Sequence, residues 1–120
     1  MLDLGRHRTA ARDVAVAAAD ELLLVVPAEV RAVIAGRRVL ESLAPPGPRP
    51  RVVVRAVPGA LPSAEVAHGL DLPLAGELHD EVTVRAATQM GEPTALLRNT
   101  ELAALCETIL RVPAAIGLAA

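Results

Sequence analysis

Residues 22–26 form a run of five consecutive apolar side chains between an acidic pair and Pro27. This run is far too short to cross a bilayer, and an isolated helix of that length would not be stable. A half-solvated strand would alternate apolar and polar residues. The remaining interpretation is a strand buried on both faces, which is typical of a parallel sheet covered by helices. Pro27 has no N–H to donate, so we expect it to end the strand.

The chain has 120 residues, enough for one domain that buries roughly two-thirds of the surface of its unfolded form. Apolar residues make up 52% of the sequence, which argues against disorder. Phe, Tyr and Trp are absent, so the core must consist of Leu, Val, Ile and Ala, each of which removes little area from water. We therefore expect marginal stability, or stabilisation by another chain.

All 12 basic residues are arginine, and the chain contains no lysine. A Walker A loop, a Schiff-base site and a phospho-acceptor receiver domain each need a lysine, so the chain holds none of these sites. The net charge of -2, with scattered charges, gives no sign of nucleic-acid binding. No signal peptide or membrane-spanning run is recognisable. The single cysteine, Cys106, excludes an internal disulfide and fits a reducing cytoplasm.

Strand and helix patterns alternate along the chain. Residues 1–7 are predicted to be a strand stub followed by a switch-like glycine turn, and residues 112–120 a docked or frayed apolar tail. Further strands are predicted at 21–26, 51–57 and 72–78, and helices at 10–19, 29–43, 63–70, about 81–90 and from residue 100 onward. Predicted caps are Thr9, Ser63 and Thr100 at helix starts and Gly91, followed by Pro93, at a helix end. Cys106 is predicted to be a small core residue on the apolar stripe of the last helix.

This alternation predicts an α/β fold: a three-layer, Rossmann-like parallel sheet of three to four strands with helices on both faces. Residues 1–120 are expected to form a single domain, because a boundary at the proline-rich loop 44–50 would leave two halves too small to fold. Ligands of such sheets bind beyond the carboxyl ends of the strands. Four segments are expected to meet at that edge: residues 3–7, 27–29, 55–59 and 79–81.

Several stretches resemble the second half of a MinD/ParA-type P-loop ATPase. They begin with Leu-Asp-Leu-Gly-Arg-His at residues 2–7 and Ala-Ala-Ala-Asp-Glu-Leu-Leu-Leu-Val-Val-Pro-Ala-Glu-Val-Arg-Ala at residues 17–32. The likeness is strongest to the actinobacterial septum-site-determining (Ssd) and CpaE-like branch, found near pilus or secretion genes. Residues 51–55 resemble the next strand of that branch, residues 72–78 the strand before the base-side loop, and residues 91–93 a late turn.

The resemblance implies a parent that uses ATP and magnesium to dimerise and so to localise machinery for division, pili or secretion. By resemblance, Asp3 matches the Walker B aspartate, which holds the water shell of the magnesium ion. Gly5 falls near the switch glycine, although Asp-Leu-Gly-Arg-His replaces the usual Asp-x-Pro-x-Gly. Arg55 stands where many relatives have an asparagine that contacts the base. The base-side loop of the resemblance comprises His79, Asp80 and Glu81.

The Walker A loop, with both its lysines, would lie before Met1. The resemblance therefore implies the carboxyl-terminal part of an ATPase without the part that grips the phosphates. We expect the chain alone to hold no ATP or magnesium and to be inactive as an enzyme. Its expected partners are a second copy or a P-loop-containing protein in the cytoplasm, with a peripheral membrane link only through the parent complex.

Two other classes of function stay open. A sheet without its first strands would have a bare edge, and bare edges pair with other chains, so the chain would be a non-catalytic α/β interaction module. An enzyme is the third class, with His7, His79, Asp80 and Glu81 as a metal cluster. Against these stand plainer interpretations: solvated loop charges for that cluster, and an exposed acid at a frayed terminus for Asp3. A solvated helix face is likewise the plainer interpretation of an anion-binding patch made by Arg8, Arg12, Arg37 and Arg38.

Overall fold

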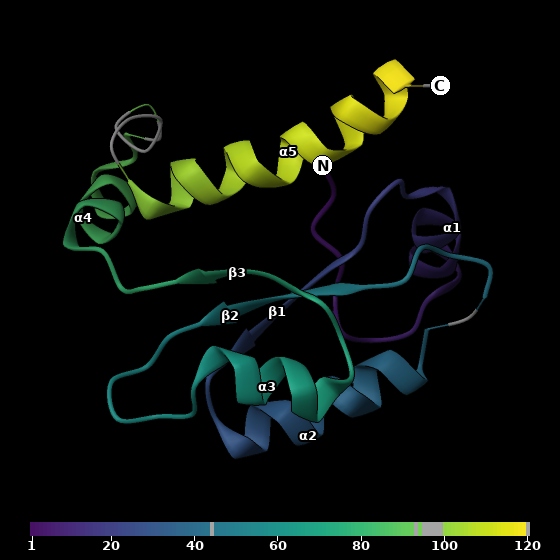
Figure 1. The fold of residues 1–120 in the computed structure, drawn as a ribbon, viewed down its shortest axis with the longest axis horizontal. Helices are drawn as coiled ribbons and strands as arrows, with labels where there is room; N and C mark the ends of the chain where they lie inside the picture. Colours follow the sequence, from purple (N-terminus) through teal and green to yellow (C-terminus); the bar gives the residue numbers. More distant parts are fainter. Residues whose placement is uncertain (44, 93, 95–99, 120) are drawn as a thin grey trace.

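The computed structural model describes residues 1–43, 45–92, 94 and 100–119 (Figure 1). These residues form an α/β fold around a three-stranded, wholly parallel sheet. Its strands are adjacent in chain order: β1 (Leu23–Pro27), β2 (Arg51–Arg55) and β3 (Leu74–Leu78). The predicted Rossmann-like α/β class and the predicted direction of the strands are thus confirmed.

Helices cover both faces of the sheet (Figure 1). Two of them, α2 and α3, connect successive strands and lie together on one face, whereas α5 crosses β3 on the other face. The shorter helix α1 lies near the end where the strands begin, and α4 follows β3. Their bounds are α1 (Ala10–Ala18), α2 (Val30–Glu41), α3 (Ser63–Leu70), α4 (Val82–Met90) and α5 (Glu101–Ala119).

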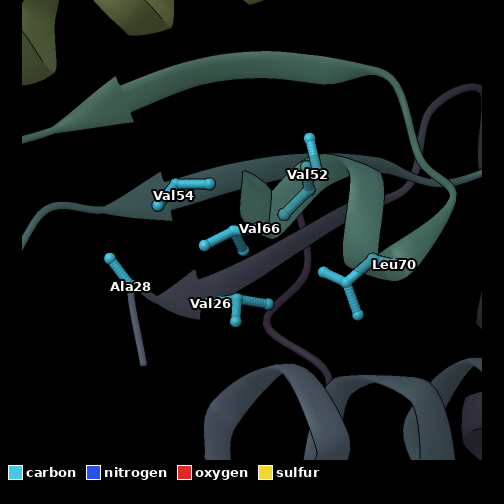
Figure 2. Packing of buried hydrophobic residues seen from close by; sticks show 7 residues of the cluster. Val26, Ala28, Val52, Val54, Val66 and Leu70 are labelled. Atoms are coloured by element: carbon cyan, nitrogen blue, oxygen red, sulfur yellow. The ribbon is translucent and has the colours of Figure 1, made fainter. Parts of the chain in front are cut away.

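The core lies between the sheet and the α2–α3 layer. Figure 2 shows side chains from β1, β2 and α3 pointing toward one another in this layer. Val52, Val54 and Val66 are 0% exposed and are the largest fully buried side chains. Because no aromatic residue is present, each buried side chain contributes little: at about 25 cal/mol per Å² of apolar area, a valine is worth roughly 1.5–3 kcal/mol.

The prediction of a strand stub in residues 1–7 is wrong. These residues adopt no strand, since none of the described strands pairs with them. Instead, the carbonyl of Arg6 accepts a hydrogen bond of 2.8 Å from Nη1 of Arg12. Arg12 is 5% exposed, and its Nη2 also donates to the carbonyl and hydroxyl oxygens of Ser42, at 3.0 and 2.8 Å. Ser42 caps the end of α2, so this contact fastens the N-terminal segment near the amino ends of the strands.

Local caps were predicted with mixed success. Thr9 accepts the Arg12 N–H at 3.1 Å, Thr100 accepts the Ala103 N–H at 3.0 Å, and Gly91 adopts the left-handed conformation (φ 68°), so these three caps are confirmed. The prediction for Ser63 is wrong: Pro62 precedes the helix, and no side chain bonds to its first turn. Pro93 and Ala44, in the predicted turn and loop, lie outside the described residues.

Helix α5 overturns two further expectations. Its backbone remains helical to Ala119, even though Pro113 removes one backbone donor, so of the two expected forms, docked or frayed, the frayed tail is wrong for residues 112–119. Cys106 is exposed, in place of the expected core position. The residues of this helix that are partly buried include Leu102, Leu105 and Ile109, whereas Cys106 is exposed although it lies on the same side of the helix.

Candidate functional site

The carboxyl ends of the three strands lie level with one another. Pro27, Arg55 and Leu78 are register partners across the sheet. The chain continues this alignment one residue further, because Ala28 N donates to Arg55 O at 3.0 Å and Ala56 N donates to Leu78 O at 2.7 Å. Residues 27–29, 55–59 and 79–81 therefore share one edge, as predicted.

The fourth segment expected at this edge, residues 3–7, is not brought to it as a strand end. Asp3 and Gly5 lie in exposed backbone outside any helix or strand, and the Arg6 carbonyl is held beside Ser42, near the opposite end of the sheet. Arg55 is exposed at the end of β2. The nucleotide-binding roles that the resemblance gives to Asp3, Gly5 and Arg55 stay predictions.

His79 lies between two carboxylates just beyond the end of β3. Its Nδ1 is 2.9 Å from Oε2 of Glu101, the first residue of α5, and its Nε2 is 3.1 Å from Oε1 of Glu77. The backbone N–H of His79 also donates to Oε2 of Glu101 at 3.3 Å. A protonated imidazole, which has two N–H donors, satisfies both carboxylates at once.

The charges in this group shift one another's protonation. The hydrogen bond and the charge of Glu101 raise the pKa of His79 above its ordinary value, with a smaller contribution from Glu77. The same hydrogen bonds from His79 lower the pKa of Glu101. The imidazolium–carboxylate pair is therefore favoured over a wider pH range than in separate side chains.

The other two loop residues also form local contacts. Glu81 Oε1 accepts the Leu102 N–H at 3.2 Å, which satisfies one free donor in the first turn of α5. Asp80 forms an ion pair with Arg85 of α4. We call the contacts of His79 and Glu81 with Glu101 and Leu102 the α5 clamp, because together they fasten the start of α5 to the loop after β3.

Beside the clamp, α5 packs directly on β3. Gly76 lies under Leu105 so closely that a Cβ added at residue 76 would clash with Leu105 Cδ1. Next to this contact is a shallow, open hollow of about 360 Å³, whose lining includes Gly76, His79, Glu101, Leu105 and Thr108. A second hollow, of about 330 Å³, lies at the other end of the sheet and is lined mainly by leucines and the proline-rich loop.

The clamp is not arranged as a metal centre. Its two carboxylates approach opposite nitrogens of the imidazole, so they do not point at one common position. Across the part of the chain that the structure describes, no three His, Cys, Asp or Glu side chains are grouped to hold a metal ion. Among the same residues, no helix is long and apolar enough to cross a membrane.

His79, Asp80 and Glu81 were predicted from the sequence, whereas both partners of the histidine were not. Glu77 was detectable, since residues two apart on a strand lie on the same face. Glu101 lies 22 positions away from His79, and no pattern in the sequence indicates that α5 folds back onto β3. Arg12, predicted to lie on a solvated face or in an anion patch, is instead buried and bonds to carbonyl groups. Arg37 is exposed, as the solvated-face interpretation expected, and bonds to the Gly69 carbonyl.

Comparison of the chain with protein-family models, with curated proteins and with solved structures finds no match. The function is therefore argued from the geometry and from the residues that carry the MinD/ParA resemblance.

Proposed function

We propose that this chain is the carboxyl-terminal part of a MinD/ParA-type protein of the septum-site-determining and CpaE-like branch. The parent of such a chain is an ATP-dependent localisation factor for septum placement or for pilus or secretion assembly, acting in the cytoplasm and meeting a membrane only through its complex. By itself the chain is inactive toward nucleotide, because its 120 residues include no lysine and hence no Walker A loop.

One observation carries the proposal. The three segments that resemble MinD/ParA strands contain β1, β2 and β3, and these are parallel, adjacent and in chain order. Their carboxyl ends are level, and ligands of α/β sheets bind beyond the carboxyl ends of the strands. This supports the relationship in fold.

The charges at that edge support the loss of nucleotide binding. Glu77, Glu81 and Glu101 bring carboxylates to the loop after β3. His79 is already shared between Glu77 and Glu101. A phosphate group at this position would meet repulsion from the carboxylates.

Isothermal titration of the chain with ATP and Mg²⁺ tests the proposal. We expect no binding heat, whereas a complete MinD/ParA-type ATPase under the same conditions gives a saturable signal. Micromolar ATP binding by the chain alone would contradict the claim that nucleotide binding is lost. In a companion experiment, the separately produced Walker A portion of a septum-site-determining protein is mixed with the chain, and a stable complex in gel filtration is expected.

A second candidate function is a non-catalytic interaction module. The observation that favours it is the outer side of β1: among the described strands, only β2 pairs with β1. An unpaired strand edge is a template for pairing with another chain. Light scattering separates this candidate from an isolated fold, since a monomer in the presence of every tested partner argues against association.

A further inference from the structure

Backbone alternation shows which groups of β1 face outward. Leu22 O accepts the Arg51 N–H at 2.9 Å, and Ala28 N donates to Arg55 O at 3.0 Å, so the even-numbered residues of this stretch bond to β2. In a strand, successive residues direct their N–H and C=O groups to opposite sides. Leu23 and Val25 therefore direct both groups away from β2, toward the side where no described strand lies.

Pro27 gives this edge part of the protection that natural edge strands have, since it offers no N–H for pairing. The five residues of β1 are Leu-Leu-Val-Val-Pro, with no charged side chain, and Val25 is 59% exposed. The other edge strand, β3, carries Glu77 and lies under α5. Charged residues are a usual means of preventing edge pairing, and among the described strands β1 alone has none, so we expect its edge to be the more open to pairing.

The accessible surface of the chain is larger than that of a compact monomer of the same mass. Its accessible surface is 8589 Å² for a mass of 12.4 kDa. A compact monomer of that mass exposes about 6,100 Å², so the chain exposes roughly 2,500 Å² more. A standard interface buries about 800 Å² on each partner. The excess, which is spread over the whole chain and is not confined to β1, exceeds the area that one partner buries in such an interface.

We propose that two copies of this chain pair through β1, antiparallel, about a two-fold axis at Val25. The two sheets then become one continuous sheet. This inference deepens the second candidate function, on which it rests, and does not depend on the MinD/ParA relationship. A two-fold axis is the common symmetry of dimers, and it requires a surface that is complementary to itself.

The register follows from the position of the axis. Each Val25 N–H donates to the Val25 carbonyl of the other copy, which gives a reciprocal pair at the centre of the five-residue strand. On either side, Leu23 lies opposite Pro27, and its N–H donates to the Pro27 carbonyl. That carbonyl also accepts the Glu29 N–H of its own copy at 2.7 Å and has a second lone pair for this bond.

Groups flanking β1 permit this approach. Arg37 bonds to Gly69 of α3 at 2.6 Å, and Ala35 lies about 200° around α2 from Arg37, hence on the flank away from α3. Ala35 is small and exposed, but the exposed Arg31 and Arg38 lie about 40° and 60° from it around the helix, so their long side chains must turn aside for the α2 helices of two copies to approach. In this register Glu21 of one copy lies opposite Glu29 of the other, and their carboxylates repel each other. Arg51 lies 2.6 Å from Glu21 of its own copy and offsets that repulsion.

Sedimentation velocity over a range of concentrations tests the dimer. We expect a species of about twice 12.4 kDa for the natural chain and a monomer for Val25→Lys, since two opposed ammonium groups repel at the axis. Val82→Lys is the matched control, because Val82 is 80% exposed on α4, and it is expected to remain dimeric. A monomeric natural chain at every concentration, or a Val25→Lys variant as dimeric as the control, would overturn the proposal.

Disulfide trapping checks the register without relying on the lysine variant. In a Cys106→Ser background, Val25→Cys is expected to form a cross-linked dimer, since directly opposed residues lie about 5.5 Å apart, within disulfide reach. Leu23→Cys is the matched control: its two copies would be offset by four positions, about 13 Å, and are expected to stay reduced. Preferential linking through residue 23 would overturn the register.

The outcomes separate this proposal from the proposed function. ATP binding by the chain contradicts the nucleotide claim and has no effect on the dimer. A chain that is monomeric alone but gains mass with the Walker A portion overturns the self-dimer and retains the interaction module.

Discussion

The two faces of the sheet are held in different ways. Beneath α2 and α3, valines are completely buried and no ionisable side chain takes part in the cluster. On the other face, α5 rests on β3 through Gly76 and Leu105 and is fastened at its start by the solvent-exposed α5 clamp. Apolar burial is insensitive to pH, whereas an exposed imidazolium–carboxylate contact depends on it. The first face therefore provides stability, and the second provides an attachment that conditions can loosen.

The largest expected loss of stability follows a substitution on the α2–α3 face. Val54→Ala removes two methyl groups from a 0% exposed site, and we expect a loss of about 2 kcal/mol in unfolding free energy. Urea unfolding followed by far-ultraviolet circular dichroism measures it. Val14→Ala on α1 is the control, because Val14 is 70% exposed and its replacement should change stability by less than about 0.5 kcal/mol. Equal losses in both variants would contradict the assignment of the core.

A smaller effect is expected where α5 meets β3. Gly76→Ala introduces a methyl group that clashes with Leu105, at a cost of about 1 kcal/mol or more from overpacking. Amide hydrogen exchange should then become faster in α5 while the amides of β2 keep their protection. The double variant Gly76→Ala with Leu105→Ala removes the clash and should restore part of the protection. Faster exchange throughout the sheet would show that the two faces are not independent.

The smallest effect concerns the α5 clamp. The pKa of folded His79 is raised above the value of about 6.5 for an unfolded histidine, so its contribution is present below that value and is lost as pH rises through the folded pKa. The pKa of Glu101 is lowered, so its contribution is present above its unfolded value and is lost as pH falls through the folded pKa. Attachment of α5 is thus strongest at mildly acidic pH.

Nuclear magnetic resonance titration of the His79 imidazole measures this directly. Glu101→Gln should lower the pKa of His79, because it removes the largest cause of the shift, and Glu77→Gln should lower it less. Asp80→Asn is the control, since Asp80 pairs with Arg85 instead. An unchanged His79 pKa in Glu101→Gln would contradict the clamp.

The sequence predictions succeeded where neighbouring residues decide a feature, and they failed where residues far apart in the chain decide it. Continuous apolar runs identified β1 and β2, and the alternation of strands and helices identified the shared direction of the three strands. The expected burial of β1 on both faces was wrong, since Val25 is 59% exposed. Thr9, Gly91 and Thr100 were identified because a cap is decided within a few residues. Glu101 and the exposure of Cys106 were missed because both depend on how α5 docks, which is a long-range property. Residues 1–7 have strand-like composition, but a strand needs a neighbouring strand, and none of the described strands supplies it.

The open outer edge of β1 is the central claim, and residue-resolved amide exchange of this strand tests it most directly. In dilute solution, Leu24 and Val26, whose groups face β2, should exchange slowly, whereas Leu23 and Val25 should exchange fast. At concentrations where copies pair, Val25 should become as slow as its neighbours. Slow exchange of Leu23 and Val25 even in the monomer would show that the chain covers its own edge, and would contradict the account.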